Sequence, residues 1–193
     1  MNPLDKIHFL DGELCPWWFA YTFDNPVRRV LHRPDRVLGA YVKEGMTVVD
    51  IGCGIGHFSV GMARLVGANG KVLSVDLQQK MLDRVDRRAR SANVADRISL
   101  QLCVPGDIGV KGQADFVLTF WMVHEVHDAE AMFGQIYAIL KDGGKWLLAE
   151  PRLHIALSSF ERTVSTAVSC GFSIIERPSV TMSYAVVLEK APK

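Results

Sequence analysis

The chain has 193 residues, 49% of which are apolar, and its formal net charge is +1 at pH 7. A chain of this length and composition can bury a core without disulfides or metals, and its near-neutral charge gives no reason to expect a polyanionic partner or a membrane surface. No apolar run reaches transmembrane length and no signal-peptide pattern is present, so we expect one domain, residues 1–193, in the cytoplasm.

The four cysteines are scattered and form no C-x-x-C pair, which argues against both a zinc site and a disulfide framework. We therefore expect reduced thiols. These residues are Cys15, Cys53, Cys103 and Cys170.

Strands and helices alternate along the chain after an aromatic-rich leader, residues 1–44, which we expect to be helical. Apolar patterns predict strands at 47–51, 71–75, 98–103, 114–120, 145–150, 173–177 and 184–189. Helices are predicted at about 57–67, 78–91, 130–140 and 158–169, the third ended by the glycines of 141–144. Alternation implies a parallel sheet, whereas the last two strands have no helix between them and must form a hairpin. We expect an α/β, doubly wound, mainly parallel seven-stranded sheet with an antiparallel last strand.

The helix predicted at 78–91 is amphipathic. Its apolar face carries Met81, Leu82, Val85 and Ala89. Its other face carries Arg84, Arg87 and Arg88, which could bind an acidic partner but are better interpreted as a solvated face.

The first strand runs into a glycine-rich loop, and Asp76 ends the second strand, 20 residues beyond Gly56. Glycine at 52, 54 and 56 lets the backbone turn sharply and lets a ligand lie against the main chain. A carboxylate at the tip of the second strand can accept both hydroxyls of a ribose. Together these features predict a site for a nucleoside-containing cofactor.

The glycine spacing distinguishes between cofactors. A dinucleotide site uses G-x-G-x-x-G, whose third glycine would fall at position 57, which is His57. The loop instead reads G-x-G-x-G behind Asp50, whose carboxylate would repel a pyrophosphate. S-adenosylmethionine has no phosphate and carries positive charge, so it suits this loop.

Residues 48–56 match the pattern h-h-D-h-G-C/G-G-x-G, and on this motif the sequence resembles the class I S-adenosylmethionine-dependent methyltransferases of the small-molecule type. The resemblance runs from about Gly45 to the C-terminus and implies a single methyltransferase domain whose seventh strand reverses into the sheet edge. It implies that Asp76 holds the ribose, that Leu77 packs under the adenine, and that a carbonyl near Phe120 receives the ammonium group. The product would be S-adenosylhomocysteine. The expected cofactor-binding residues are Asp50, Gly52, Cys53, Gly54, Gly56, Asp76, Leu77, Cys103, Val104 and Phe120.

The adenine site departs from the family pattern, which often has an acid just after the third strand. Cys103, Val104 and Pro105 stand there, and Asp107 follows later. Either Asp107 reaches back, or main chain and packing at Cys103 and Val104 hold the adenine; we favour the second. Asp107 is equally well interpreted as an acid in a surface turn.

The run from Phe120 to Asp128 contains His124-Glu125, but a zinc protease needs H-E-x-x-H and position 128 is aspartate, so we expect no metal. Methyl transfer to oxygen or nitrogen can require a base, and His124 with its neighbour Glu125 is the candidate catalytic pair. The alternative is that His124 orients the loop and Glu125 caps a helix. His127 and Asp128 resemble a helix start, with Asp128 as the N-cap.

The methyl acceptor is not fixed by the sequence. The run after the fourth strand, Phe-Trp-Met-Val from residue 120, is not the (D/N/S)-P-P-(Y/F) of methyltransferases that act on nucleobases or glutamine, so we expect a small molecule and no nucleic acid. Residues 1–44 would form a lid, or a helix pinned to the core by Trp17 and Trp18, or both. A protein or RNA methyltransferase, or a non-catalytic cofactor-binding regulatory subunit, remains the alternative. The oligomeric state stays unknown.

Overall fold

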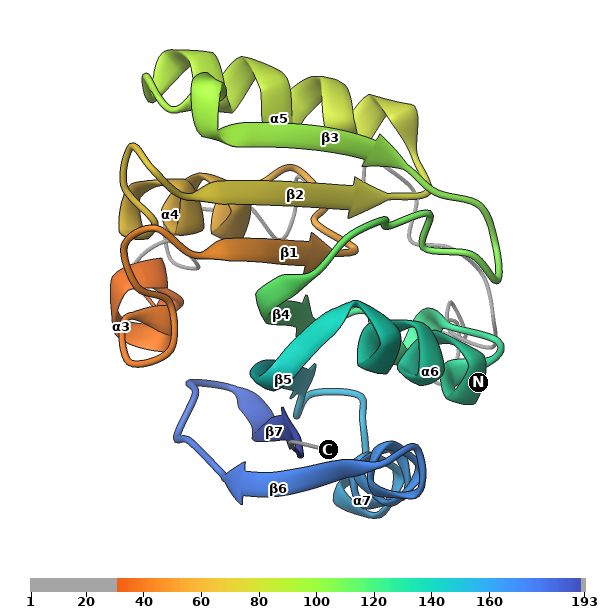
Figure 1. Ribbon diagram of the computed structural model, residues 1–193. Coiled ribbons are helices and arrows are strands. Elements are labelled where there is room, and N and C mark those ends of the chain that lie inside the picture. The colour runs from red at the N-terminus through yellow and green to blue at the C-terminus, as the bar shows by residue number, and fades with distance from the viewer. Residues whose placement is uncertain (1–30, 192–193) are drawn as a thin grey trace, which may run out of the picture.

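In residues 31–191, which the computed structural model describes, seven strands form one sheet in the order β3-β2-β1-β4-β5-β7-β6 (Figure 1). The strands from β1 to β5 run parallel, and β7 runs antiparallel to both of its neighbours, β5 and β6. The predicted doubly wound, mainly parallel sheet with an antiparallel last strand is therefore confirmed. The strands are Thr47–Ile51 (β1), Lys71–Asp76 (β2), Ile98–Leu102 (β3), Ala114–Phe120 (β4), Leu140–Pro151 (β5), Phe172–Glu176 (β6) and Ser183–Lys190 (β7).

The last strand does not lie at the sheet edge, where the family resemblance placed it. β7 lies between β5 and β6, and β6 forms the edge. Residues 185–188 of β7 are all buried, whereas residues 173–176 of β6 are exposed. The more apolar strand of the hairpin takes the inner position because only there are both of its faces covered.

Helices cover both faces of the sheet, so a hydrophobic core lies on each face. Successive residues of a strand pack into these two cores in turn. Val48 packs in the cluster that includes residues of α3, α4 and α5, and its neighbour Val49 packs in the cluster that includes α6 and α7. This alternation follows from the two-residue period of a strand. The helices are Pro34–Leu38 (α3), His57–Leu65 (α4), Gln79–Ser91 (α5), Ala129–Ile139 (α6) and Leu157–Ser169 (α7), with short 3₁₀ turns at Ala95–Arg97 (η2) and Val123–Glu125 (η3).

The end of α6 differs from the prediction. The helix ends at Ile139, and residues 141–144 belong to β5 instead of forming its cap. Leu140 is buried, has an extended backbone and pairs with Ala114 of β4. It is therefore the first residue of β5, and α6 ends one residue before the predicted end at 140. The N-cap prediction is confirmed, because the Asp128 side chain accepts a hydrogen bond from the amide of Ala131.

The predicted apolar face of α5 is also confirmed, since Met81, Leu82, Val85 and Ala89 are buried. The arginine face is not wholly solvated. Arg88 donates a hydrogen bond to the carbonyl of Ile55 at 3.0 Å, so α5 is tied to the glycine loop.

The leader prediction falls mostly on residues 1–30, which lie outside the described residues, as do Cys15, Trp17 and Trp18. In its described part, α3 packs closely on α4: a Cβ at Gly61 would stand 2.2 Å from Cβ of Pro34. None of the helices within residues 31–191 is both long and apolar enough to cross a membrane.

Candidate active site

Three carboxylates are buried among the described residues, and all three lie at the carboxyl ends of parallel strands. Asp50 near the end of β1 is 3% exposed, Asp76 at the end of β2 is 8% exposed, and Glu150 near the end of β5 is 2% exposed. Burying an ionisable group is costly unless it is paired, so such groups mark candidate functional sites. Ligands of open α/β sheets bind outside this edge.

The glycine loop after β1 folds as its spacing predicts. The amides of Gly52 and Cys53 both donate to the carbonyl of Val75, at 2.9 and 3.0 Å, which holds the loop across the end of β2. Gly52, Gly54 and Gly56 all have positive φ, at 68°, 53° and 81°, a region that side chains with a Cβ rarely adopt. Below the loop, the Asp50 carboxylate accepts a hydrogen bond from the Ser59 hydroxyl at 2.5 Å.

The three glycines face different surroundings. A Cβ at Gly52 would stand 2.8 Å from Cγ of Met122, and one at Gly56 would stand 2.9 Å from Cγ2 of Val85. At Gly54 no heavy atom of the described residues would lie within 4 Å of an added Cβ. The outer two positions are therefore glycine because protein packs against them, whereas Gly54 borders open space where a ligand can approach. The contact with Met122 also sets the loop against the segment that carries His124.

Asp76 fixes the loop as well as facing the proposed ribose site. Its two carboxylate oxygens accept hydrogen bonds from the amides of Gly54 and Gln78, each at 2.9 Å. Burial raises the pKa of Asp76 above its usual value, against the hydrogen bonds from the amides of Gln78, Gly54 and Leu77. Each carboxylate oxygen can accept a second hydrogen bond, so ribose hydroxyls can be added to these contacts.

The expected adenine residues lie beside Asp76. The amide of Cys103 donates to the carbonyl of Asp76 at 3.1 Å, and that of Val104 donates to the carbonyl of Asp107 at 3.2 Å. Both amides are thus engaged within the protein, and the exposed Val104 side chain and half-buried Leu77 and Cys103 are left for packing. The Asp107 side chain accepts from the amide of Gly109 at 2.8 Å, as the surface-turn interpretation predicts.

Two other residues of the expected cofactor set have constrained side chains. Burial raises the pKa of the Cys53 thiol well above its usual value, with the charges of Asp50 and Asp76 adding to the effect, so this thiol is a poor nucleophile. The Phe120 side chain packs against Phe58, with ring centroids 4.4 Å apart, so the main chain is the part of Phe120 left to meet a ligand.

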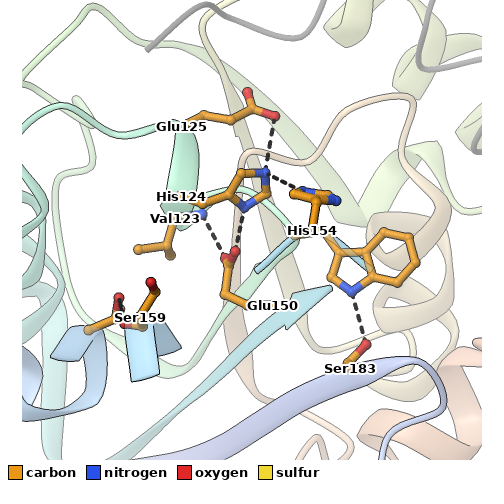
Figure 2. Close-up of polar contacts among 9 residues, drawn as sticks. Val123, His124, Glu125, Glu150, His154, Ser159 and Ser183 are labelled. Atoms are coloured by element: carbon orange, nitrogen blue, oxygen red, sulfur yellow. Dashed lines mark hydrogen bonds and ion pairs between the residues drawn. The ribbon is translucent and has the colours of Figure 1, made fainter. Parts of the chain in front are cut away.

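His124 stands beside two carboxylates, but its direct partner is not the neighbour that the sequence suggested. Figure 2 shows the ring between Glu150 on one side and Glu125 and His154 on the other. Nδ1 of His124 is hydrogen-bonded to Oε2 of Glu150, while Oε1 of Glu150 accepts the amide of Val123 at 2.9 Å. Oε1 of Glu125 lies 3.9 Å from Nε2 of His124. Glu150 therefore orients the ring, and Glu125 adds a more distant charge.

The charges around His124 stabilise the protonated form of its ring. Burial alone would lower the pKa of His124, but the hydrogen bond to Glu150 and the charges of Glu150 and Glu125 outweigh it and raise the pKa above its usual value. Burial and the charge of His124 lower the pKa of His154, against the charge of Glu150. Nε2 of His154 lies 3.2 Å from Nε2 of His124.

Sequence reasoning missed the role of Glu150, although a signal for it was present. Residues 150–154 follow a buried apolar strand, so the sequence predicts that they converge with the other carboxyl strand ends, but it does not identify Glu150 as the partner of His124. The contact between His124 and His154 had no local signal, because the two residues are 30 positions apart. Trp121 was also not anticipated: it has φ of 61°, a strained value for a bulky residue, directly after β4.

The raised pKa of His124 predicts how stability changes with pH. A histidine with a folded-state pKa above the unfolded value of about 6.5 contributes stability that is present below that value and is lost as pH rises through the folded pKa. Glu150→Gln removes the main partner, so the variant should lack this loss. From pH 5.5 to pH 9, we expect the wild type to lose stability relative to the variant, by about 1.4 kcal/mol per unit of pKa difference. Urea unfolding at both pH values measures this, and parallel changes in the two proteins would contradict it.

Comparison with known proteins identifies the family. A family model described as a methyltransferase domain matches residues 42–176. A demethylmenaquinone methyltransferase of Lactobacillus johnsonii is 33% identical over 105 residues, which are 54% of this chain and 43% of the relative. A carboxy-S-adenosyl-L-methionine synthase of Alteromonas mediterranea is 25% identical over 68% of this chain and 55% of the relative. The chain spans about half the length of these curated relatives.

Solved structures show the same fold. A SAM-dependent methyltransferase from Aquifex aeolicus superposes with a TM-score of 0.82 at 18% identity, covering 92% of this chain and all of that one. A second, from Methanococcus maripaludis, gives a TM-score of 0.75 at 18% identity, covering 92% of this chain and 94% of that one. With the family model matching more than half of the chain, this protein belongs to the class I S-adenosylmethionine-dependent methyltransferases.

Proposed function

We propose that this chain transfers a methyl group from S-adenosylmethionine to a small-molecule acceptor. One observation carries the proposal: the open space over Gly54 is bordered by Asp76, and the same loop touches Met122, two residues before His124. A cofactor seated on the loop would thus lie beside a half-buried, oriented imidazole. S-adenosylmethionine would supply the electrophilic methyl carbon, and the product would be S-adenosylhomocysteine.

The residues have distinct proposed roles. Asp76 would hold the ribose, the loop from Gly52 to Gly56 would take the methionine moiety, and Leu77, Cys103 and Val104 would pack against the adenine. His124 would act as the base that finally holds the proton, oriented by Glu150, with Glu125 supporting the positive charge of its ring. Alignment of the acceptor at about 3–3.5 Å from the methyl carbon would supply most of the rate enhancement.

A small acceptor is favoured by the near-neutral charge of the chain and by its similarity to demethylmenaquinone methyltransferases. We place the protein in the cytoplasm, because the three cysteines within the described residues are free. The test incubates the protein with labelled S-adenosylmethionine in three separate reactions. One contains a small-metabolite extract with added demethylmenaquinone, the second contains total protein, and the third contains total RNA. Label in the protein or RNA fraction alone would favour those acceptor classes, and label in none would favour a regulatory subunit.

The cofactor preference is itself a prediction. The G-x-G-x-G loop behind Asp50, with His57 in place of the third dinucleotide glycine, suits a cationic ligand without phosphate. In calorimetric titration we expect S-adenosylmethionine and S-adenosylhomocysteine to bind and nicotinamide dinucleotides to give no measurable heat. A preference for the dinucleotide would end the methyltransferase proposal.

A further inference from the structure

Three side chains form a continuous hydrogen-bonded row from the buried strand end to the surface. Glu150 is 2% exposed and contacts Nδ1 of His124; Nε2 of His124 lies 3.2 Å from Nε2 of His154, which is exposed (Figure 2). The two imidazole rings meet edge to face, with centroids 4.9 Å apart and planes at 70°. The row thus joins β5, η3 and the loop after β5, and it ends at the surface.

The partners fix where the hydrogens lie in the neutral rings. A buried carboxylate only accepts, so Nδ1 of His124 carries the hydrogen and Nε2 carries the lone pair. The contact at 3.2 Å then requires Nε2 of His154 to donate, which leaves the lone pair of His154 on Nδ1. The chain of donors and acceptors therefore runs in one direction, from His154 through His124 to Glu150.

We propose that Glu150, His124 and His154 form a proton relay, in which His154 is the catalytic residue that meets the methyl acceptor. As the acceptor atom attacks the methyl carbon and the carbon–sulfur bond breaks toward sulfur, the acceptor's proton passes to Nδ1 of His154. The proton on Nε2 of His154 passes to Nε2 of His124, and the imidazolium that forms is held by Glu150. The reverse path returns the proton to water after the product leaves. This role rests on the proposed methyl transfer.

The electrostatics of the row suit this direction of transfer. The charged and titratable groups around His124 are Glu150 from β5, Glu125 from η3 and His154 from the loop after β5. The pKa of His124 is raised and that of His154 is lowered, so the proton is more stable on the inner ring. The 3.2 Å separation of the two Nε2 atoms is within the range of an N–H···N hydrogen bond.

The relay narrows the class of acceptor. A base is needed when the attacking group must lose a proton, as a phenolic or enolic hydroxyl or an acidic carbon must. A thioether or a tertiary amine attacks through a free lone pair and gains nothing from a base. We therefore infer that the acceptor carries such a hydroxyl or carbon acid.

The relay can be tested without knowing the acceptor, by NMR of ¹⁵N-labelled histidine rings in buffer with EDTA. We expect a scalar coupling between Nε2 of His124 and Nε2 of His154, with Nδ1 of His154 unprotonated in the neutral form. His124→Gln should raise the pKa of His154, and Glu150→Gln should lower that of His124. His127→Gln is the matched control, because His127 is exposed in the same segment and should leave both titrations unchanged. Independent titration of the two rings, or a proton on Nδ1 of neutral His154, would overturn the relay.

Activity separates this inference from the proposed function. With the metabolite fraction that accepts label, His154→Gln should lower kcat by about 10²-fold with unchanged affinity for S-adenosylmethionine, and His127→Gln should not. Full activity of His154→Gln would refute the catalytic role of His154 while leaving methyl transfer in place. If S-adenosylmethionine binds and no fraction is labelled, the proposed methyl transfer is refuted. The NMR couplings still decide whether Glu150, His124 and His154 form the hydrogen-bonded row.

Discussion

Replacing Gly54 by valine is expected to abolish binding of S-adenosylmethionine while the protein stays folded. Within residues 31–191 no heavy atom lies within 4 Å of a Cβ built at this position, so the new side chain would meet none of the described residues and would enter the proposed ligand space. The φ of 53° adds backbone strain of about 1–3 kcal/mol, which a domain of this size should withstand. The larger effect falls on the ligand, because a β-branched side chain would occupy the volume proposed for the methionine moiety.

The control is Gly143→Val. Gly143 has φ of 73°, and an added Cβ there also has none of the described residues within 4 Å. It lies in the first residues of β5, at the opposite end of the strand from Glu150. Both variants should lose similar stability without ligand, and only Gly54→Val should lose the rise in Tm that S-adenosylmethionine gives by mass action. A rise in Tm retained in Gly54→Val would mean that the loop only joins strand to helix.

Much of the fold could be predicted from the sequence, because the strands and helices carry strong local patterns. β1 and β4 have the predicted bounds, and the buried face of α5 follows from spacing alone. The place of β7 could not be predicted in this way. A hairpin fixes the relative direction of its two strands, but which of them pairs with β5 depends on burial over the whole sheet.

The site was predictable where residues lie at strand ends and not where contacts join distant segments. Gly54 and Asp76 are 22 positions apart, yet both stand at recognisable points of a strand–loop–helix–strand unit. His124 and Glu150 are 26 positions apart and meet because β4 and β5 are neighbours in the sheet. Sequence proximity suggested Glu125 instead, and at 3.9 Å from Nε2 it is the more distant of the two carboxylates.

Replacing Asp76 by alanine should weaken binding of S-adenosylmethionine at least tenfold. The change removes the proposed acceptor for the ribose hydroxyls. Each hydrogen bond to a charged group is worth roughly 1.5–3 kcal/mol, and about 1.4 kcal/mol corresponds to a tenfold change in affinity. It also frees the amides of Gly54 and Gln78, so part of the loss would come from the loop. Asp107→Ala is the matched control, since it removes a comparable turn contact, to Gly109, at the same sheet edge. If packing holds the adenine, as we expect, this control leaves the affinity unchanged.

The two effects of Asp76→Ala can be separated with a second ligand, the 2′-deoxy analogue of S-adenosylhomocysteine. If Asp76 accepts the ribose hydroxyls, the wild type should bind S-adenosylhomocysteine more tightly than the analogue, and Asp76→Ala should bind the two alike. Loop damage alone would weaken both ligands by the same factor and preserve their ratio. Calorimetric titration of both proteins with both ligands gives the coupling free energy between Asp76 and the 2′-hydroxyl. A coupling of zero would mean that another residue binds the ribose.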